Sequence, residues 1–171
     1  KEPPLVFFAT EATPYAQGRD SPFAPEGISS RDVLDFGLAV LKLPIPLIGV
    51  PWFQVDHLPS AGVIAHEGGP AVDRDFGLRS ALEPALQALP IPGERKAAWI
   101  KWLPELLADC YGILGTGPAY VYALIGYLAD APEVVERETR SATEWQIYPT
   151  RHLRVLFNLK VLDALGLAVA D

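Results

Sequence analysis

The chain contains very little cysteine and no methionine. Cys110 is the single cysteine among 171 residues, so no disulfide can form within the chain. The sequence therefore fits a reducing compartment such as the cytoplasm, or a fold that needs no bridges. Because the chain begins at Lys1 and has no methionine, it fits a trimmed chain or a fragment. Its first residues lack the positively charged stretch and the apolar run of a signal peptide.

Positive charge is also scarce. The 14 lysine and arginine residues are outnumbered by 21 acidic residues, for a net charge of -7, which argues against non-specific binding to nucleic acid. Half of the residues are apolar and a fifth are charged, so the composition carries no signature of disorder. The longest uncharged run, residues 110–129, is interrupted at Gly115 to Pro118. We therefore expect two buried helices there and no membrane span.

The pattern of apolar residues predicts a single, mostly helical α+β domain over residues 1–171, with a few short strands. Residues 1–30 are expected to be an extended or loop segment that contains a strand at 5–8, and a second strand is expected at 47–50. Ser30 and Ser60 are the expected N-caps of two helices. Helices are predicted at residues 31–43, 61–76, 78–89, 94–111, 118–128 and 151–165.

The same periodicity predicts which helical residues are buried. In the last helix a stripe with a period of 3.6 residues is expected to face the core; it consists of Leu153, Val155, Leu156, Leu159, Leu162 and Leu165. The helix from residue 61 is expected to bury Val63, Ile64, Ala71, Val72 and Phe76, and the next helix Leu82, Leu86 and Leu89.

One short stretch carries the strongest functional signal. His66 followed by Glu67 is the front half of the zinc-peptidase motif H-E-x-x-H, in which two histidines four residues apart bind zinc and the glutamate is the general base. The place of the second histidine is taken by Pro70, which has no side-chain donor. Pro70 also lacks the backbone N–H that would bond the carbonyl of His66. Gly68 and Gly69 add conformational freedom to the backbone before it. We therefore expect the helix to kink near Gly69 or to restart at Pro70.

A second signal lies further along the chain. Glu105 and Asp109 lie four positions apart (i and i+4) in an otherwise apolar helix, so both carboxylates lie on one face. A pair of carboxylates in such a place is costly unless it has partners. A positive ion or an imidazole would supply them.

Together the two signals resemble the gluzincin, or thermolysin-like, type of zincin-like metallopeptidase. The resemblance covers residues 60–109 and makes the helices within 60–111 the predicted active-site helices. It implies that His66 and Glu105 are zinc ligands, that Glu67 is the general base, and that Asp109 orients His66 through its other ring nitrogen. It also implies a hydrolase that cleaves peptide bonds, with a peptide or protein as substrate or partner.

The loss of the second histidine changes this expectation. Two protein ligands are left where a catalytic zinc site has three, so zinc binding is expected to be weakened or absent and activity impaired or lost. Asp73, two turns after His66, and His57, in the preceding loop, are candidate substitute ligands. Tyr148 and His152 are candidate stabilisers of an oxyanion, or simply part of an exposed polar helix start that also includes Arg151 and Arg154. Cys110 is interpreted as a small buried hydrophobe.

Several functional hypotheses remain open at this point. The chain could be an impaired metallopeptidase-like domain, or an active hydrolase with altered ligands. The resemblance could also be accidental, with His66 a core histidine satisfied by Asp109 or Glu105. A further alternative is a non-catalytic protein-binding or assembly module that retains the fold, with aromatic residues on its surface or in its core, namely Trp52, Phe53, Trp99 and Trp102. No Ser/His/Asp arrangement, phosphate-binding loop or zinc-finger spacing stands out.

Overall fold

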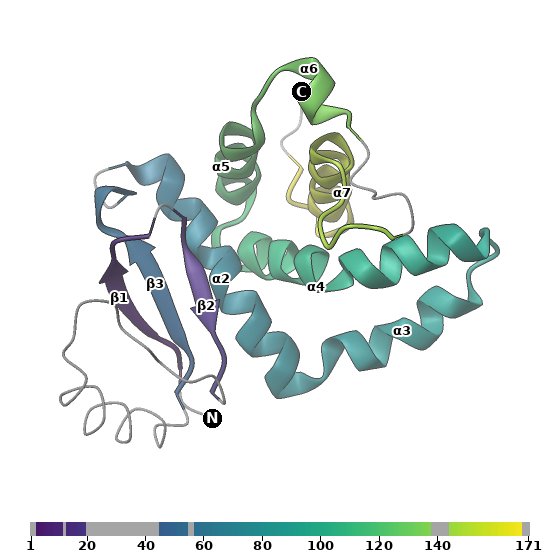
Figure 1. Ribbon diagram of the computed structural model, residues 1–171, viewed down its shortest axis with the longest axis horizontal. Helices are drawn as coiled ribbons and strands as arrows, with labels where there is room; N and C mark the ends of the chain where they lie inside the picture. The colour runs from purple at the N-terminus through teal and green to yellow at the C-terminus, as the bar shows by residue number, and fades with distance from the viewer. Residues whose placement is uncertain (1–2, 12, 20–44, 55–56, 138–143, 169–171) are drawn as a thin grey trace.

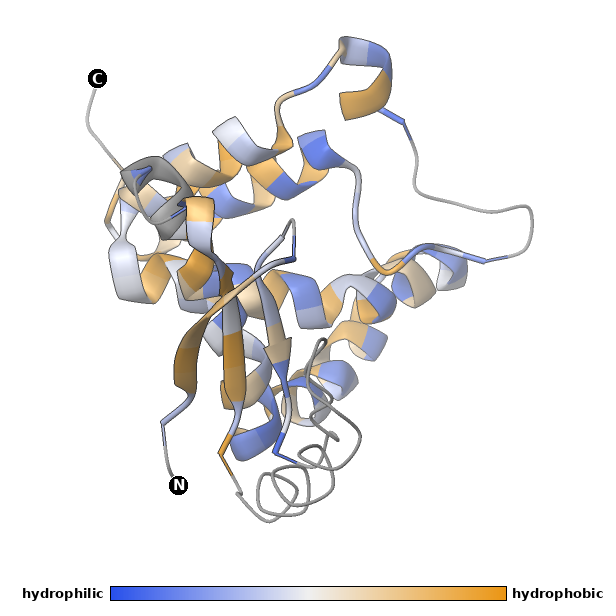
Figure 2. Ribbon diagram, turned by 60° about the vertical axis from the view of Figure 1, so that its left-hand side comes forward, coloured by the Kyte–Doolittle hydropathy of each residue, from blue (hydrophilic) through white to orange (hydrophobic). Residues whose placement is uncertain are grey.

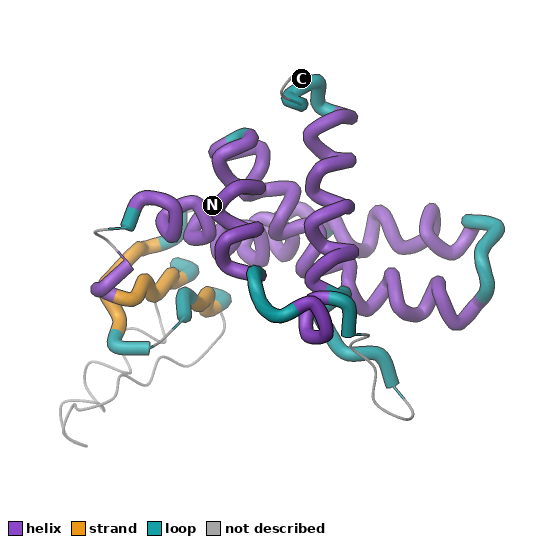
Figure 3. Tube along the Cα trace, turned by 90° about the horizontal axis from the view of Figure 1, so that it is seen from above, coloured by secondary structure: helices purple, strands orange, loops and turns teal. Residues whose placement is uncertain are grey.

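The protein is a mostly helical α+β structure with a small sheet at one end (Figure 1), as the sequence predicts. The computed structural model describes residues 3–11, 13–19, 45–54, 57–137 and 144–168, and the side chains of all of these except 58–61. The helix predicted at 31–43, with Ser30 as its cap, lies outside the described residues. Seen from above, the strands gather beside the helices without mixing among them (Figure 3).

The sheet has three strands in the order β1-β3-β2. The strand β1 (Leu5–Ala9) runs parallel to β3 (Leu47–Pro51), and β2 (Tyr15–Gln17) pairs with β3 in the antiparallel sense. The central strand β3 is uncharged and largely buried, and β1 consists of hydrophobic residues, whereas β2 is mixed (Figure 2). Strands at 5–8 and 47–50 were predicted from the sequence. The three-residue strand β2 was not, because it is short and lies in a stretch that is rich in turn residues.

One long helix, α2, lies between the sheet and the other helices (Figure 1). The helices α3 and α4 form an antiparallel pair that extends away from the sheet, while α5 and α7 pack against α4. A single 3₁₀ turn, η1 (Trp52–Gln54), precedes α2. The helices are α2 (Leu58–Phe76), α3 (Leu78–Ala88), α4 (Gly93–Thr116), α5 (Pro118–Leu128), the short α6 (Pro132–Val135) and α7 (Arg151–Ala164).

The helix α2 corrects two predictions. It begins after His57, so Ser60 is not its N-cap, and it continues through Pro70 to Phe76. The restart predicted at Pro70 is therefore wrong; a kink near Gly69 stays a prediction. The helix ends where Gly77 adopts φ 64°, and its N–H donates to the carbonyl of Asp73 at 2.7 Å, which is the left-handed helix end that glycine favours.

The glycine pair in α2 has a packing role. A Cβ atom added to Gly69 would lie 2.4 Å from the Cα of Ala108 in α4, and one added to Gly68 would lie 2.6 Å from the ring of Tyr111. The two helices therefore cross so closely that no side chain fits between them at Gly69. This close approach compensates for the weak helical propensity of glycine and explains why α2 continues past Pro70.

Replacing Gly69 by Ala is expected to lower the free energy of unfolding by about 1–3 kcal/mol or more, because the added methyl group meets helix backbone, which moves less easily than a side chain. Gly115→Ala is the matched control. It lies in α4 and its added Cβ meets nothing within 4 Å, so stability should rise by about 0.5–1 kcal/mol. Denaturation in guanidinium chloride measures both variants, and equal effects would contradict the close crossing.

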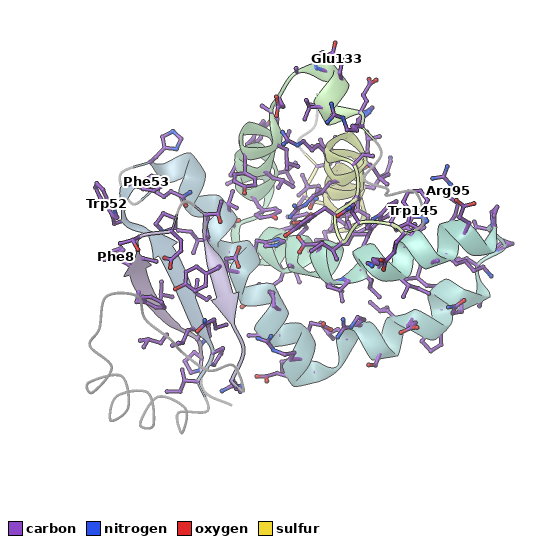
Figure 4. All side chains as sticks on the ribbon, in the orientation of Figure 1. Phe8, Trp52, Phe53, Arg95, Glu133 and Trp145 are labelled. Atoms are coloured by element: carbon purple, nitrogen blue, oxygen red, sulfur yellow. The ribbon has the colours of Figure 1, made fainter. Side chains whose placement is uncertain are left out.

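The core consists of two clusters of apolar side chains, in which the aromatic residues of α4 are prominent. Trp102 is 3% exposed, and its Nε1–H donates to the carbonyl of Gln146 at 3.1 Å. Trp52 and Phe53, by contrast, are exposed beside the sheet, as is Phe8, whereas Trp145 packs on the helical side beneath Arg95 (Figure 4). One cluster contains Ala98, Trp102, Leu106 and Trp145, and the other Ile113, Tyr120, Val121, Leu124 and Leu162.

Several predicted core positions are wrong. Phe76 is 75% exposed, Leu82 and Leu89 are also exposed, and α3 has no fully buried residue. The leucine stripe of α7 is its buried face only in part: Leu162 is buried, as predicted, but Leu156, Leu159 and Leu165 are exposed. The residues that α7 buries are Arg154, Asn158 and Leu162. The physical reason for this polar face is a charged partner on α4, described below.

The uncharged stretch 110–129 forms two helices, as expected, because Gly117 with φ 62° separates α4 from α5. The helices are not buried throughout, since Leu114 and Tyr122 are 68% and 70% exposed. None of the helices in the described ranges is both long and apolar enough to cross a membrane.

Candidate functional site

The crossing of α2 and α4 brings together the residues of the two sequence signals. The Nδ1 atom of His66 lies 2.8 Å from Asp109 Oδ1, and its Nε2 atom lies 3.4 Å from Glu105 Oε2. His66 is 9% exposed and Asp109 is completely buried. One imidazole therefore bridges two carboxylates that lie one helical turn apart on α4.

Arg154 of α7 binds the same carboxylates. Its Nε donates to Asp109 Oδ2 at 2.7 Å and its Nη2 donates to Asp109 Oδ1 at 2.6 Å. This is the two-pronged geometry in which a guanidinium binds a carboxylate most strongly. Nη2 also lies 3.6 Å from Glu105 Oε2. The start of α7 is held by the side chain of Thr150, which accepts from the N–H of Leu153 at 3.1 Å.

Two further side chains complete the surroundings of Asp109. The hydroxyl of Tyr120 donates to its Oδ1 at 2.5 Å, and Nδ2 of Asn158 donates to its Oδ2 at 2.9 Å. Asp109 thus accepts hydrogen bonds from side chains of α2, α5 and α7. These bonds compensate for the cost of burying a carboxylate, and they account for the polar face that α7 buries.

Neighbouring groups in this network stabilise the charged forms of Asp109 and His66. Burial disfavours ionised Asp109, but its hydrogen bonds to Arg154 and His66 outweigh burial and hold its pKa well below its usual range. Burial also lowers the pKa of His66, but hydrogen bonds to Asp109 and Glu105 outweigh it and raise the pKa from 6.5 to about 9. Burial, with the charge of Asp109, raises the pKa of Tyr120. At neutral pH His66 and Arg154 are therefore positive and Asp109 is negative.

The raised pKa of His66 predicts a loss of stability in mild alkali. The folded state binds this proton more tightly than the unfolded chain does, so the stabilisation is fully present below pH 6.5. It is lost as the pH rises through about 9, for a total of about 3 kcal/mol at most. Denaturation curves between pH 6 and 10 measure the loss, and the His66 imidazole signals in an NMR titration should move near pH 9. A midpoint near 6.5 would contradict the network.

A cavity of about 530 Å³ opens beside His66. Glu67 is half-buried in its wall, and burial raises the pKa of this carboxyl group, with nearby His66 acting in the opposite direction. Pro70 lines the cavity one turn after His66. The lining is drawn from the segment around β2 and from α2, α4, α5 and α7, and includes His66, Glu67, Pro70, Glu105, Tyr148 and Arg154. Both sequence signals thus meet in one cavity.

The other candidate site residues are placed differently. Asp73 is buried at the junction of α2 and α3, where its Oδ1 accepts from the N–H of Arg79 at 2.8 Å. His57 lines a separate, smaller cavity beside α5, and His152 is exposed on α7. Of the two candidate oxyanion stabilisers, only Tyr148 lines the cavity beside His66. Asp73, His57 and His152 do not line that cavity.

Cys110 adjoins Asp109 in the chain but lines an apolar groove between α3 and α4. Burial, aided by the charge of Asp109, raises the pKa of its thiol to about 11. The thiol is therefore neutral at physiological pH, as expected for a small hydrophobic residue.

Three important residues were missed or undervalued in the sequence. The sequence predicts Arg154 only as part of a polar helix start. It predicts no site role for Asn158 or Tyr120. A signal for the first two existed, because they lie four residues apart in a leucine-rich helix, as Glu105 and Asp109 do. Tyr120 offered no such signal, since a tyrosine in an apolar helix is most often part of the core.

Among the described residues, the donor atoms next to His66 number fewer than the three that a catalytic zinc site takes from the protein. His66 Nε2 and Glu105 Oε2 lie side by side, but Pro70 has no donor, and a catalytic zinc ion takes three protein ligands. Within the described ranges, no group of three or more His, Cys, Asp or Glu side chains is arranged to hold a metal ion. A proton on His66 also competes with a metal for Nε2.

No protein-family model matches the chain, and searches of curated proteins and of solved structures found no match either.

Proposed function

We propose that the chain is a zincin-like metallopeptidase domain of the gluzincin type, in which zinc-dependent hydrolysis of peptide bonds is impaired or lost. The observation that carries this proposal is the double contact of His66. Its Nδ1 contacts Asp109 and its Nε2 faces Glu105, which is the relation that the resemblance of the two motifs implies. The replacement of the second histidine by Pro70 is the proposed cause of the loss.

The cavity supports the same proposal. Glu67, the residue that would act as general base in an intact centre, lines it together with His66 and Glu105. Pro70 lies in the same wall. The second histidine of the motif, if present at position 70, would therefore stand beside His66 and Glu105. The expected partner is a peptide or protein. With a single cysteine in the chain, we propose a reducing compartment such as the cytoplasm.

A second candidate function is a non-catalytic protein-binding or assembly module that retains the fold. It is favoured by the charge balance around His66. Asp109 and Arg154 form a bidentate ion pair, and His66 Nε2 is paired with Glu105 Oε2 at 3.4 Å, these being the two atoms that would bind zinc. The opposite charges around His66 are therefore paired without a metal ion, as a stable binding scaffold requires.

Zinc content tests the proposal. Elemental analysis of protein purified without chelator should find well below one zinc per chain in the present sequence, about one in Pro70→His, and no gain in Pro70→Ala. Stoichiometric zinc in the present sequence would contradict an impaired centre. Absence of zinc from Pro70→His would count against the gluzincin assignment.

A further inference from the structure

The cavity beside His66 contains one carboxylate on which the positive charges of His66 and Arg154 act only from a distance. In the part of the chain that the structure describes, Glu67 forms neither a hydrogen bond nor an ion pair, although it lines the cavity and is half-buried. Its neighbour Glu105 is shared between His66, 3.4 Å away, and Arg154, 3.6 Å away. A half-buried carboxylate without a partner is costly, and a ligand of opposite charge would remove that cost.

The positive groups of the cavity are already occupied. Arg154 is bound bidentately by Asp109. Arg151 donates from Nη1 to Asp130 Oδ2 at 2.8 Å and to the carbonyl of Leu128 at 3.1 Å. A negatively charged ligand would compete with these carboxylates for the arginines and would approach Glu67, so the charges of the cavity favour a cation.

The rest of the lining suits a cation on an aliphatic stem. Tyr15, Tyr127 and Tyr148 line the cavity, and tyrosine offers both an aromatic face, which attracts cations, and a hydroxyl acceptor. Val63, Leu124 and Leu128 supply apolar surface in the same cavity. A volume of about 530 Å³ accommodates a side chain or a short peptide end.

From these contacts we propose that the cavity binds a primary ammonium group of a peptide, with Glu67 as its ion-pair partner and the tyrosines around it. The ammonium group is either the N-terminus of the peptide or a lysine side chain, which share this chemistry. The inference rests on the proposed function in one respect, namely that no zinc ion occupies the centre next to Glu67.

The test measures peptide binding by NMR titration in buffer with a chelator. The probes are acetyl-Ala-Lys-Ala-amide, Ala-Ala-Ala-amide with a free N-terminus, and acetyl-Ala-norleucine-Ala-amide, which keeps the stem but lacks the charge. At least one of the two ammonium peptides should bind about tenfold more tightly than the norleucine peptide, and the stronger one identifies the source of the ammonium group. Equal binding of all three would overturn the proposal.

Variants assign the effect to the cavity. Glu67→Gln keeps the shape and should abolish the tenfold preference, whereas Glu133→Gln, which removes an exposed carboxylate on α6 that does not line the cavity, should retain it. Tyr127→Leu should weaken ammonium binding several-fold, and thermal unfolding checks that each variant is folded. A preference that persists in Glu67→Gln would overturn the proposal.

The result is distinguishable from a failure of the proposed function. In zinc-loaded Pro70→His the positive ion lies beside Glu67, so the preference for ammonium should disappear. If Pro70→His binds no zinc while the present sequence still prefers ammonium peptides, the metallopeptidase assignment fails and the ammonium site stands. If Pro70→His binds zinc but the present sequence shows no preference, the reverse holds.

Discussion

Replacing Asp109 by Asn is expected to lower the free energy of unfolding by about 3–5 kcal/mol. Asp109 is completely buried and accepts hydrogen bonds from His66, Tyr120, Arg154 and Asn158. The amide has one acceptor atom where the carboxylate has two, so at least one donor is left facing an N–H. The larger part of the cost comes from the positive charges of His66 and Arg154, which stay buried without their anion.

Asp130→Asn is the matched control, because Asp130 also pairs with an arginine but at an exposed position, with Arg151 Nη1 2.8 Å from its Oδ2. Its loss should make little difference, since exposed ion pairs contribute little. The double variant Asp109→Asn/Arg154→Gln tests the cause, because removing the orphaned positive charge should recover part of the stability. Guanidinium denaturation at pH 7 measures all three. A loss in Asp109→Asn no larger than in Asp130→Asn would contradict the buried network.

Replacing Pro70 by His is expected to raise zinc affinity well beyond the roughly 10–100-fold that a residue supporting a ligand contributes, because a ligand itself is restored. The affinity should increase with pH up to about 9, since zinc must displace the proton of His66, whose pKa is raised to about 9. Calorimetric titration with zinc at pH 6, 7 and 8 measures this dependence. In this variant a further Glu67→Gln substitution should leave zinc bound and remove any hydrolysis of a test peptide.

Pro70→Ala separates the backbone from the ligand. Pro70 lies inside α2, where it provides no N–H for the carbonyl of His66, a defect worth about 3 kcal/mol in a helix interior. Alanine restores that N–H without adding a donor for zinc, so the variant should be more stable by up to about 3 kcal/mol and bind no more zinc. Increased zinc binding in Pro70→Ala would show that a group other than residue 70 completes the metal site.

Much of the fold follows from local patterns. The 3.6-residue periodicity and the proline and glycine positions predicted α2, α3, α5 and α7 within about three residues, for example at Pro118, which opens α5. The relation between His66 and the pair Glu105 and Asp109 was predicted from the resemblance of the motifs, and the need of a carboxylate pair for a positive ion or an imidazole agrees with it. These inferences succeed because they depend on interactions within one helix or on the cost of an unpaired charge.

Other features depend on which helices meet. Gly68 and Gly69 suggested looseness in the sequence, yet in the structure they are the surface on which α4 lies. The leucine stripe of α7 suggested its buried face, yet Arg154 and Asn158 are buried in place of Leu156 and Leu159. Periodicity predicts which residues share a face of a helix. It does not predict which face packs against another helix.

The sequence by itself determined that the chain forms a helical domain with a histidine and two carboxylates in need of one another, and that Pro70 cannot bind a metal. Only the tertiary structure decided how that need is met. The crossing of α2 and α4 at Gly69 brings His66 to Asp109, and the packing of α7 adds Arg154. The reason is that Asp109 has no way to be buried except with charge and hydrogen bonds from other helices, and such partners are chosen by packing in three dimensions.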